Sequence, residues 1–555
     1  MAAAHPELLW VVITSGLVAV FLAMAIGAND VANALSTSIG SGSLKLRNAI
    51  VVAFVFEIVG ALLLGGSVSD AIRKKVLNFS AFNDSPRDLA IGMMSATLSA
   101  TVWLVFATWF GIPVSTTHSI VGALAGFGVA SGRVDSVRWI KMLYILLSWI
   151  LVPLIAVVVS GTMYILLQEA MFRRKHSFTV LRYSQPFLIT ITTLPLAILL
   201  AFENPLMKAD VKEGGLFNFI QWFKASKGNQ WIVILSISVL IAGILTPSSY
   251  FAGIKRIKDG WSFLETQQHT TTEINDHFTT KLKNFLTRER SQSMQMNIGK
   301  DRLEVIDMSN VTTSKATHGS LLQSAMDNEQ ITKVTDQLKE TENHKTEVMF
   351  SAMQIIGAIT VIISHSANDT ANAVAPFATV LLLYLYGMEE TSSHTPWYIL
   401  LTGGLCMALG LAFFGYQVIK SVGMKLTRVT PSRGFTIDMT AGNIVLLVSY
   451  LGIPLSSTHA SVSSIMGVGL VDNLKTQNFN EVPVLELNAP ERTGWRRFPI
   501  LNRITTSNVN FKLYSKIFVT WITTIFASGI MSATLYVVII FCCKIISGDS
   551  VSNAM

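Results

Sequence analysis

An Asn-Asp segment occurs twice in this sequence, each time inside a stretch of mostly apolar residues. Residues 27–34 read Gly-Ala-Asn-Asp-Val-Ala-Asn-Ala, and residues 366–373 read Ser-Ala-Asn-Asp-Thr-Ala-Asn-Ala. A carboxylate such as Asp30 or Asp369 in the middle of a membrane helix costs roughly 2.5–3.5 kcal/mol, so such residues usually face a cavity, bind an ion or relay a proton. The alternative is a polar helix-packing contact, because the small neighbours allow close approach. Two equivalent copies favour the functional interpretation.

A second motif also occurs twice, and it combines a helix-breaking proline with hydroxyl side chains. Residues 111–118 read Gly-Ile-Pro-Val-Ser-Thr-Thr-His, and residues 452–459 read Gly-Ile-Pro-Leu-Ser-Ser-Thr-His. Because proline is tolerated in the first turn of a helix, we expect the hydroxyl residues at a helix start. Free backbone N–H groups, the positive end of the helix dipole and hydroxyl donors together form an anion site there. The alternative is a kink at which Ser and Thr cap their own helix.

The two motifs recur in the same order, which indicates an internal repeat. The separation from Asp30 to His118 is 88 residues, and that from Asp369 to His459 is 90 residues. The apolar runs that precede the second copy are odd in number, so the two copies are expected to have opposite orientations in the bilayer. Inverted repeats of this kind are typical of secondary transporters, whose site lies where the repeats meet.

The chemistry of the two motifs is complementary. An anion and two carboxylates repel each other in a low-dielectric site, so we expect a cation or a proton between them. Sodium is a hard ion that accepts carboxylate, amide and hydroxyl oxygens, and we expect it at the Asn-Asp segments with the anion at the helix starts. Glu57, in the apolar run 53–60, is expected to serve an ion pathway. The imidazoles of His118, His365 and His459 either titrate or hold structural hydrogen bonds.

The composition places these motifs in a membrane protein. Of the 555 residues, 51% are hydrophobic and 14% are charged, with a mean hydropathy of +0.49. Soluble domains carry about 25% charged residues. The net charge of +8 comes from basic residues scattered between apolar runs, which we interpret as topology signals rather than a nucleic-acid surface. Cys406, Cys542 and Cys543 have neither a disulfide framework nor zinc-ligand spacing, and we expect no cofactor.

The apolar residues come in discrete runs, several of which reach the length of about 20 residues that a membrane helix needs. The runs lie near 8–28, 48–66, 89–110, 115–130, 143–168, 187–203, 231–247, 348–366, 371–387, 397–417, 440–453, 458–471 and 517–543. Some runs are too short or interrupted to be simple spans. We therefore predict an all-α, polytopic membrane protein of about twelve transmembrane segments, built from two inverted repeats with broken or re-entrant helices.

The chain divides into two membrane halves joined by a polar stretch. The halves are residues 1–247 and 348–555, and residues 248–347 between them show little sustained apolar periodicity. We expect this stretch to be a largely flexible linker or regulatory loop. Basic residues at 45–47 and 173–182 indicate a cytoplasmic side, and the stretch falls on that side.

The paired motifs resemble those of the inorganic phosphate transporter family, the type III sodium-phosphate symporters. The resemblance covers both membrane halves and excludes residues 248–347. It implies a sodium-coupled symporter of inorganic phosphate that works by alternating access as a multi-pass homodimer among membrane lipids, with the plasma membrane as its expected location. Glu57 and His365 fall where family members have a glutamate and a histidine implicated in transport. Proton coupling stays open, because plant-type relatives use protons with similar motifs.

The motifs and the resemblance together give the expected ligand residues. The residues expected to bind phosphate are Asp30, Asn33, Ser115, Thr116, Thr117, Asp369, Asn372, Ser456, Ser457 and Thr458. The residues expected to bind sodium are Asn29, Asp30, Asn368, Asp369, Glu57 and Asp438.

Two positions depart from the family pattern. Animal relatives have glutamate where Met93 aligns, and family members usually have glutamate at Asp438. Asp438 keeps the charge with a shorter reach, whereas Met93 does not, so coupling or affinity is expected to differ while the substrate class is not.

Two rival classes fit parts of the sequence. An intramembrane aspartyl protease also has two membrane aspartates, but it has one of them in a Gly-x-Gly-Asp context, which is absent here. A phosphate receptor that does not transport would share the anion site. A peptide-cleavage assay and an uptake assay distinguish these rivals from a transporter.

Overall fold

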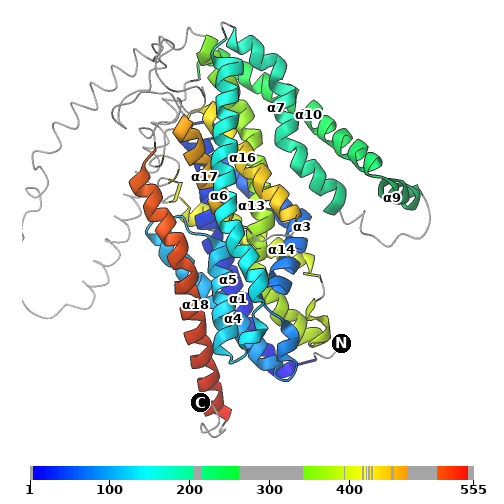
Figure 1. Ribbon diagram of the computed structural model, residues 1–555, viewed down its shortest axis with the longest axis vertical. Coiled ribbons are helices and arrows are strands. Elements are labelled where there is room, and N and C mark those ends of the chain that lie inside the picture. Colours follow the sequence, from blue (N-terminus) through cyan, green and yellow to red (C-terminus); the bar gives the residue numbers. More distant parts are fainter. Residues whose placement is uncertain are drawn as a thin grey trace, which may run out of the picture.

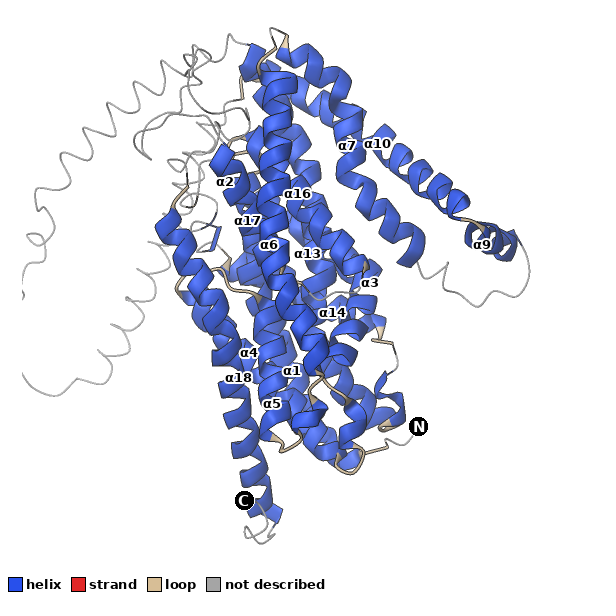
Figure 2. Ribbon diagram, viewed as in Figure 1, coloured by secondary structure: helices blue, strands red, loops and turns tan. Residues whose placement is uncertain are grey.

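The computed structural model is almost entirely helical (Figure 2). It describes residues 4–203 apart from 175, then 215–261, 342–415 apart from 393, 429–451, 455–471 and 509–547, and isolated positions between 418 and 426. Among these residues no strand is formed, and an isolated bridge pairs Leu77 with Val137. The expected all-α fold is confirmed.

The first half of the chain contains most of the helices. They are η1 (Pro6–Leu8), α1 (Leu9–Ile26), the π-helix η2 (Gly27–Val31), α2 (Ala32–Gly40), α3 (Leu46–Val76), η3 (Phe79–Phe82), α4 (Pro86–Trp109), α5 (Thr116–Ala130), η4 (Val134–Ser136), α6 (Trp139–Leu167), η5 (Gln168–Phe172), α7 (Ser177–Glu203), α9 (Gly215–Ala225) and α10 (Lys227–Lys258). The described helices of the second half are α13 (Glu342–Tyr386), η7 (Glu389–Ser392), α14 (Trp397–Phe414), α16 (Pro431–Tyr450), α17 (Ser457–Val471) and α18 (Phe511–Ser547).

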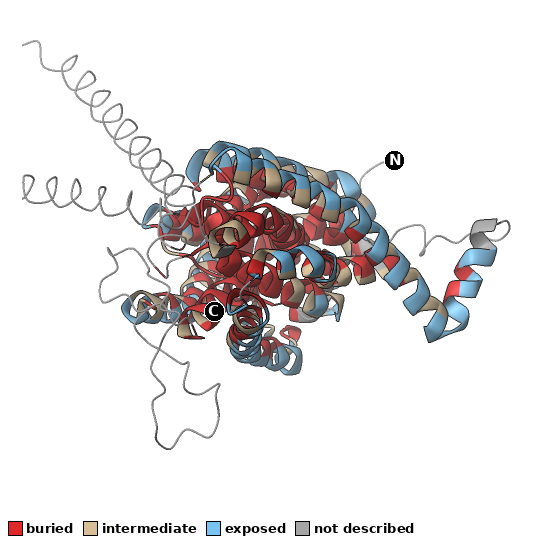
Figure 3. Ribbon diagram, turned by 90° about the horizontal axis from the view of Figure 1, so that it is seen from above, coloured by how far each residue is buried: buried red, intermediate tan, exposed pale blue. Residues whose placement is uncertain are grey.

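Nine helical segments of the described chain are long and apolar enough to cross a membrane, and Thr116–Ala130 is a shorter apolar helix. Side chains at the centre of the bundle are buried, whereas the outer helix faces are exposed and rich in large apolar residues (Figure 3). Phe526 and Ile530 of α18, for example, are 64% and 68% exposed. Such faces are stable against lipid, where helices satisfy their own backbone hydrogen bonds. The structure is that of a multi-pass membrane protein.

Helix α13 forms the centre of the bundle, and α18 lies at its edge (Figure 1). In the most apolar stretch of each, 89% of the α13 residues are buried, compared with 17% for α18. Helices α7, α9 and α10 lie at one side of the bundle, where α7 and α10 pack against α13, and apolar contacts among Ala197, Phe223 and Ile234 join the three helices. The candidate site is expected along α13, which is the most buried of the long helices.

The helices differ from the apolar runs in two places. The runs 348–366 and 371–387 form one continuous helix, α13, which passes through the second Asn-Asp segment and Pro376 without a break. The first run continues beyond 28 through η2 to Gly40. Helices also occupy both ends of the predicted loop, since α10 ends at Lys258 and α13 begins at Glu342. Residues 262–341 lie outside the described chain.

The break predicted at the first Gly-Ile-Pro motif is present. Helix α4 ends at Trp109, Gly111 has φ 64°, and α5 begins at Thr116. With 15 residues, α5 is shorter than the roughly 20 residues that a full crossing requires. The residues 452–454 of the second motif lie outside the described chain, and α17, also of 15 residues, begins at Ser457.

A close helix crossing holds η2 in place. A Cβ atom at Gly27 would lie 1.8 Å from the carbonyl oxygen of Met407 on α14, and one at Gly410 would lie 1.9 Å from that of Met24 on α1. Only glycine allows the two backbones to approach so closely. The first Asn-Asp segment is thus fixed against α14.

Candidate functional site

Both Asn-Asp segments lie inside long helices, not at helix ends. The first forms the π-helix η2, and the second lies in the middle of α13. π-helical turns inside α-helices are frequent at functional sites. The side chains of Asp30 and Asp369 are fully buried. Two carboxylates therefore lie in the interior of a membrane bundle, where each requires specific partners.

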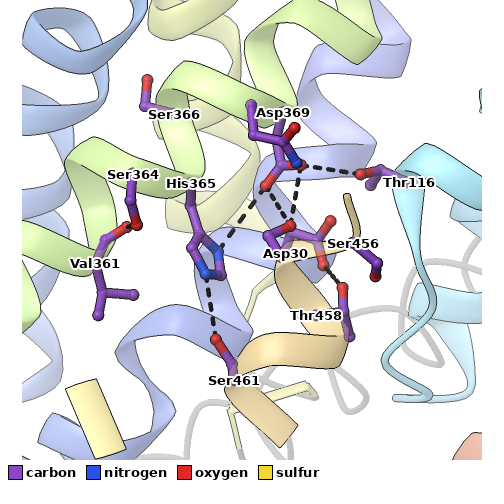
Figure 4. Close-up of polar contacts among 12 residues, drawn as sticks. Asp30, Thr116, Val361, Ser364, His365, Ser366, Asp369, Ser456, Thr458 and Ser461 are labelled. Carbon is purple, nitrogen blue, oxygen red and sulfur yellow. Dashed lines mark hydrogen bonds and ion pairs between the residues drawn. The ribbon is translucent and has the colours of Figure 1, made fainter. Parts of the chain in front are cut away.

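Asp369 accepts hydrogen bonds from three helices (Figure 4). The Thr116 hydroxyl at the start of α5 donates to its Oδ1 over 3.1 Å. The Ser457 hydroxyl at the start of α17 lies 3.1 Å from Oδ1 and 3.0 Å from Oδ2. The amides of Asn368 and Asn372 on α13 donate to Oδ1 over 3.1 and 3.3 Å. This carboxylate joins both helix starts to the second Asn-Asp segment.

Asp30 accepts its hydrogen bond from the other copy of the repeat. The Thr458 hydroxyl of α17 donates to its Oδ1 (Figure 4). The same hydroxyl lies 3.1 Å from the carbonyl oxygen of Val114, and the equivalent Thr117 hydroxyl lies 2.8 Å from that of Leu455. Each helix start thus contacts the loop that precedes the other one.

The first hydroxyl of each helix start caps its own helix. Ser115 Oγ accepts from the backbone N–H of His118, and Ser456 Oγ accepts from that of His459, each over 3.2 Å. The capping interpretation therefore holds for these two serines, while the hydroxyls that follow reach into the site. The N–H groups of the first two residues of each helix have no acceptor within the helix, so they are candidates for contact with an anion.

The first asparagine of each segment holds a loop. The Asn29 amide donates to the carbonyl oxygen of Ile112 over 3.0 Å, and its Oδ1 accepts from the N–H of Val114 over 3.0 Å. Asn368 donates to the carbonyl oxygen of Leu455 over 3.1 Å. Asn29 and Asn368 therefore each position the start of a helix. Their binding to sodium remains a prediction.

The second asparagine of each segment leaves polar atoms unpaired. Asn372 donates to the hydroxyl oxygens of Thr116 and Thr117 over 3.2 and 3.0 Å. Its Oδ1 and both polar atoms of Asn33 are buried without a hydrogen-bond partner in the described part of the chain. Unsatisfied buried polar groups are rare and call for an explanation. These three atoms are therefore candidates for contact with a ligand.

Glu57 and Asp438, the other two acidic residues predicted to bind sodium, lie in different parts of the structure. Glu57 on α3 lies next to the second segment, because the Ser366 hydroxyl donates to its backbone oxygen. Both carboxyl oxygens of Glu57 are buried and accept no hydrogen bond from the described residues. Asp438 instead contacts Thr37, seven residues beyond Asp30 along α2. The predicted sodium ligands thus form more than one group.

Met93 lies in the apolar core and is 2% exposed. An ionised glutamate in that environment would need a partner, and methionine needs none. The departure at this position from the pattern of animal relatives is therefore compatible with the local packing.

Two of the three histidines form a structural cluster behind the helix starts. His118 Nδ1 lies 3.0 Å from the carbonyl oxygen of Trp521, and its ring lies 3.7 Å from that of Trp149. His459 reverses the pattern, with Nδ1 3.3 Å from the Trp149 carbonyl oxygen and its ring 3.8 Å from that of Trp521. The two imidazoles meet edge to face at 4.5 Å. These contacts favour the structural interpretation for both residues.

The third histidine contacts the site. His365 lies one turn before Asp369, with Nδ1 3.9 Å from its Oδ2. Its Nε2 lies 3.2 Å from the Ser461 hydroxyl on α17 (Figure 4). His365 therefore connects the second carboxylate to the helix that begins at Ser457.

Sequence reasoning missed several residues that the fold brings to these groups. Thr37 continues the spacing of Asp30 and Asn33 along one helix face, so helical periodicity could have indicated it. Gln354 and Ser461 come from distant positions, and no local pattern marks them. Only the packing of α13 against α16 and α17 places them near the acidic residues.

The fold and the site define a polytopic membrane protein of the transporter class, with two buried carboxylates at its centre. Among the described residues, no lysine or arginine forms an ion pair with Asp30 or Asp369, and the basic group that approaches Asp369 is the imidazole of His365 at 3.9 Å. A family model described as the phosphate transporter family matches residues 26–532. The chain belongs to this family.

Known relatives agree with this assignment. A sodium-dependent phosphate transporter of Plasmodium falciparum is 33% identical, over 96% of this chain and 97% of the relative. A putative phosphate permease of Pyrococcus furiosus is 31% identical, over 82% of this chain and 86% of the relative. A solved structure titled as the sodium-dependent phosphate transporter aligns with a TM-score of 0.63 and 25% identity, covering 96% of this chain and all of that one.

Proposed function

We propose that this chain is a sodium-coupled symporter of inorganic phosphate, that it works by alternating access, and that it is not an enzyme. The observation that carries the proposal is the exchange of contacts between the copies. Asp30 of the first copy accepts the Thr458 hydroxyl of the second, and Asp369 of the second accepts the Thr116 hydroxyl of the first. Cation ligands and anion donors are therefore contiguous.

Contiguity explains why the two substrates must bind together. Two unit charges 4 Å apart interact by about 4 kcal/mol at an effective dielectric constant near 20. A phosphate at the helix starts would be repelled by Asp30 and Asp369 by this order of energy. Sodium ions at the Asn-Asp segments change that repulsion into attraction, and by linkage phosphate strengthens sodium binding equally.

The proposed ligand groups follow from the chemistry of each atom. Phosphate takes the backbone N–H groups at the starts of α5 and α17 and the unpaired amide N–H groups of Asn33. The hydroxyls of the helix starts and the Asn372 amide join them by turning from Asp369 to the anion. Sodium takes the carboxylates of Asp30 and Asp369 and the amide oxygens of Asn29 and Asn368. Glu57, with two unpaired carboxyl oxygens, and Asp438 provide further cation positions.

Alternating access would use the repeat. The contacts of Thr117 with Leu455 and of Thr458 with Val114 exchange equivalent positions, and the His118–His459 contact has the same reciprocity. Reciprocal contacts support two inverted copies that rock about a shared centre. We also propose that the protein is a homodimer in the plasma membrane.

The proposal is tested by radiolabelled phosphate uptake into proteoliposomes in which the sodium, potassium and proton gradients are varied independently. We expect an inward sodium gradient to drive accumulation and a potassium gradient to leave it at the passive level. Accumulation driven by protons without sodium would establish the alternative, proton coupling. Phosphate binding without any uptake would identify a receptor and overturn the proposal.

The Thr116→Val substitution is expected to raise the apparent dissociation constant for phosphate about ten-fold or more. Valine keeps the shape of threonine but removes the hydroxyl, which donates to Asp369 in this structure and would turn to phosphate when the anion binds. A hydrogen bond to a charged group contributes roughly 1.5–3 kcal/mol. The remaining backbone donors should prevent complete loss. The matched control is Ser226→Ala, which removes the cap of α10 remote from the site.

The measurement is calorimetry of phosphate binding in sodium and of sodium binding without phosphate. We expect the substitution to weaken sodium binding less than phosphate binding. An equal loss of both would show that the Thr116 hydroxyl is a sodium ligand, contrary to the proposed division.

A further inference from the structure

A second group of buried polar side chains lies beyond the Asn-Asp site, toward the turn that follows α2. We name it the Gln354 cluster, and its members are Thr37, Ser38, Ser41, Ser43, Gln354 and Asp438. All of them are 0–2% exposed. They come from α2 and its following turn, from α13 and from α16. The cluster joins α2 and its following turn to α13 and α16, with Ser43 and Gln354 311 residues apart in the chain and Thr37 and Asp438 401 residues apart.

Gln354 is the centre of the cluster. Its Oε1 accepts from the hydroxyls of Ser41 and Ser43 over 2.7 and 2.6 Å. Its Nε2 donates to Asp438 Oδ2 over 3.4 Å, and Thr37 donates to Oδ1 of the same carboxylate over 2.5 Å. Ser38 adds a contact of 3.2 Å to Oδ2. One amide therefore ties α2 and α16 to α13.

Glycine residues provide the space for this amide. A Cβ atom at Gly434 would lie 1.9 Å from Gln354 Nε2, and one at Gly357 would lie 3.1 Å from the Cβ of Asp438. The α13–α16 contact thus fits one glutamine and one carboxylate without room for further side chains. The position of Gln354 is determined by packing as well as by hydrogen bonds.

The cluster lies between the Asn-Asp site and the end of α10. Asp30, Asn33, Thr37 and Ser41 recur at helical spacing, and Thr37 lies about 10 Å beyond Asp30 along the helix. At the far end, Arg256 donates to the Ser43 carbonyl oxygen over 2.9 Å and to the Ser351 hydroxyl over 2.6 Å. Arg256 lies in the last turn of α10.

We infer that the Gln354 cluster is a gate that closes the Asn-Asp site on the side that faces the end of α10. Arg256 connects this gate to α10. The inference rests on the proposed transport function, because a gate needs a substrate path. Opening would separate α2 from α13 and α16, and it would leave Gln354, Asp438 and the serines unpaired unless water entered. The gate therefore opens only when water enters along the polar face of α2 and pairs with these side chains.

The test is hydrogen exchange, followed by mass spectrometry, of the full-length protein in detergent with sodium and inorganic phosphate present. In Gln354→Met, which keeps the length of the side chain but removes both hydrogen-bonding ends, we expect the peptide over residues 34–44 to exchange about ten-fold faster or more. The matched control is Gln185→Met, because Gln185 is buried and donates to Ser249 between α7 and α10. The control should leave that peptide unchanged.

A second variant covers the case in which Gln354→Met does not fold. Ser41→Ala combined with Ser43→Ala removes two donors to Gln354 and retains the backbone oxygen that Arg256 contacts. We expect faster exchange of the same peptide, and Arg256→Gln should have a smaller effect in the same direction. Unchanged exchange in the folded Gln354 or double-serine variants would overturn the gate.

Uptake separates failure of the gate from failure of transport. If wild-type protein shows no sodium-driven uptake, the proposed function fails whatever the exchange result. If wild-type protein transports and Gln354→Met exchanges faster, we expect accumulation to fall at least five-fold because the site leaks. Full accumulation in that variant would show that the cluster is structural.

Discussion

The Asp369→Asn substitution is expected to reduce sodium-driven phosphate uptake at least about a hundred-fold while the protein still folds. Asparagine replaces one acceptor oxygen by a donor NH2 group, which faces the donors Thr116 and Ser457. Two hydrogen bonds to a charged group, at roughly 1.5–3 kcal/mol each, correspond to about this factor. The loss of the negative charge also removes the proposed partner of sodium. The measurement is uptake per folded molecule in proteoliposomes.

The control for this substitution is Asp84→Asn. Asp84 is an exposed carboxylate that pairs with Arg133 at 2.7 Å outside the membrane-spanning helices, and hydrogen bonding from Arg133 lowers its pKa. The same chemical change there should leave uptake within about two-fold, because exposed ion pairs contribute little. Normal sodium-driven uptake by folded Asp369→Asn protein would remove this carboxylate from the mechanism.

The Gly27→Ala substitution is expected to prevent folding or to destabilise the protein by about 4 kcal/mol or more. The backbone of Gly27 has φ −59°, so alanine is not strained there by its own conformation. The cost is steric, since the added Cβ would lie 1.8 Å from the Met407 carbonyl oxygen and must force α1 and α14 apart. Overpacking typically costs about 1–3 kcal/mol, and a larger cost is expected here because a backbone oxygen cannot move aside by changing rotamer.

Folded yield by size-exclusion chromatography and the thermal midpoint measure this effect. Gly410→Ala should behave in the same way, because its Cβ would meet the Met24 carbonyl oxygen at 1.9 Å. Gly243→Ala is the matched control, since no atom lies within 4 Å of its Cβ position, and helix propensity predicts a small gain there. Wild-type stability of Gly27→Ala would mean that the two helices do not cross so closely.

Helix class and membrane character were predictable because they depend on local properties. Apolar runs of sufficient length form membrane helices whatever their neighbours, and proline together with Gly111 ends α4 through its own backbone preference. The continuity of α13 was not predicted, because polar residues inside a helix look like an interruption when their burial partners are unknown.

The candidate site was predictable in its residue types but not in its contacts. Repetition marked Asp30, Asp369 and the helix starts, since two copies of the same polar string in apolar surroundings require a reason. It could not separate the roles of adjacent hydroxyls. Ser115 and Ser456 cap their helices, while Thr116 and Ser457 reach Asp369, because successive residues of a helix point about 100° apart.

The sequence by itself determined that two carboxylates and two helix starts exist in a membrane bundle. Only the tertiary structure decided which of them meet. Thr458 reaches Asp30 from 428 residues away, and Gln354 joins Ser41 to Asp438 across three helices. Such pairings depend on how closely helices approach, which glycines at positions such as Gly27 and Gly434 permit. Helical periodicity fixes the face on which a side chain lies, but the partner of that face follows from the packing of the whole bundle.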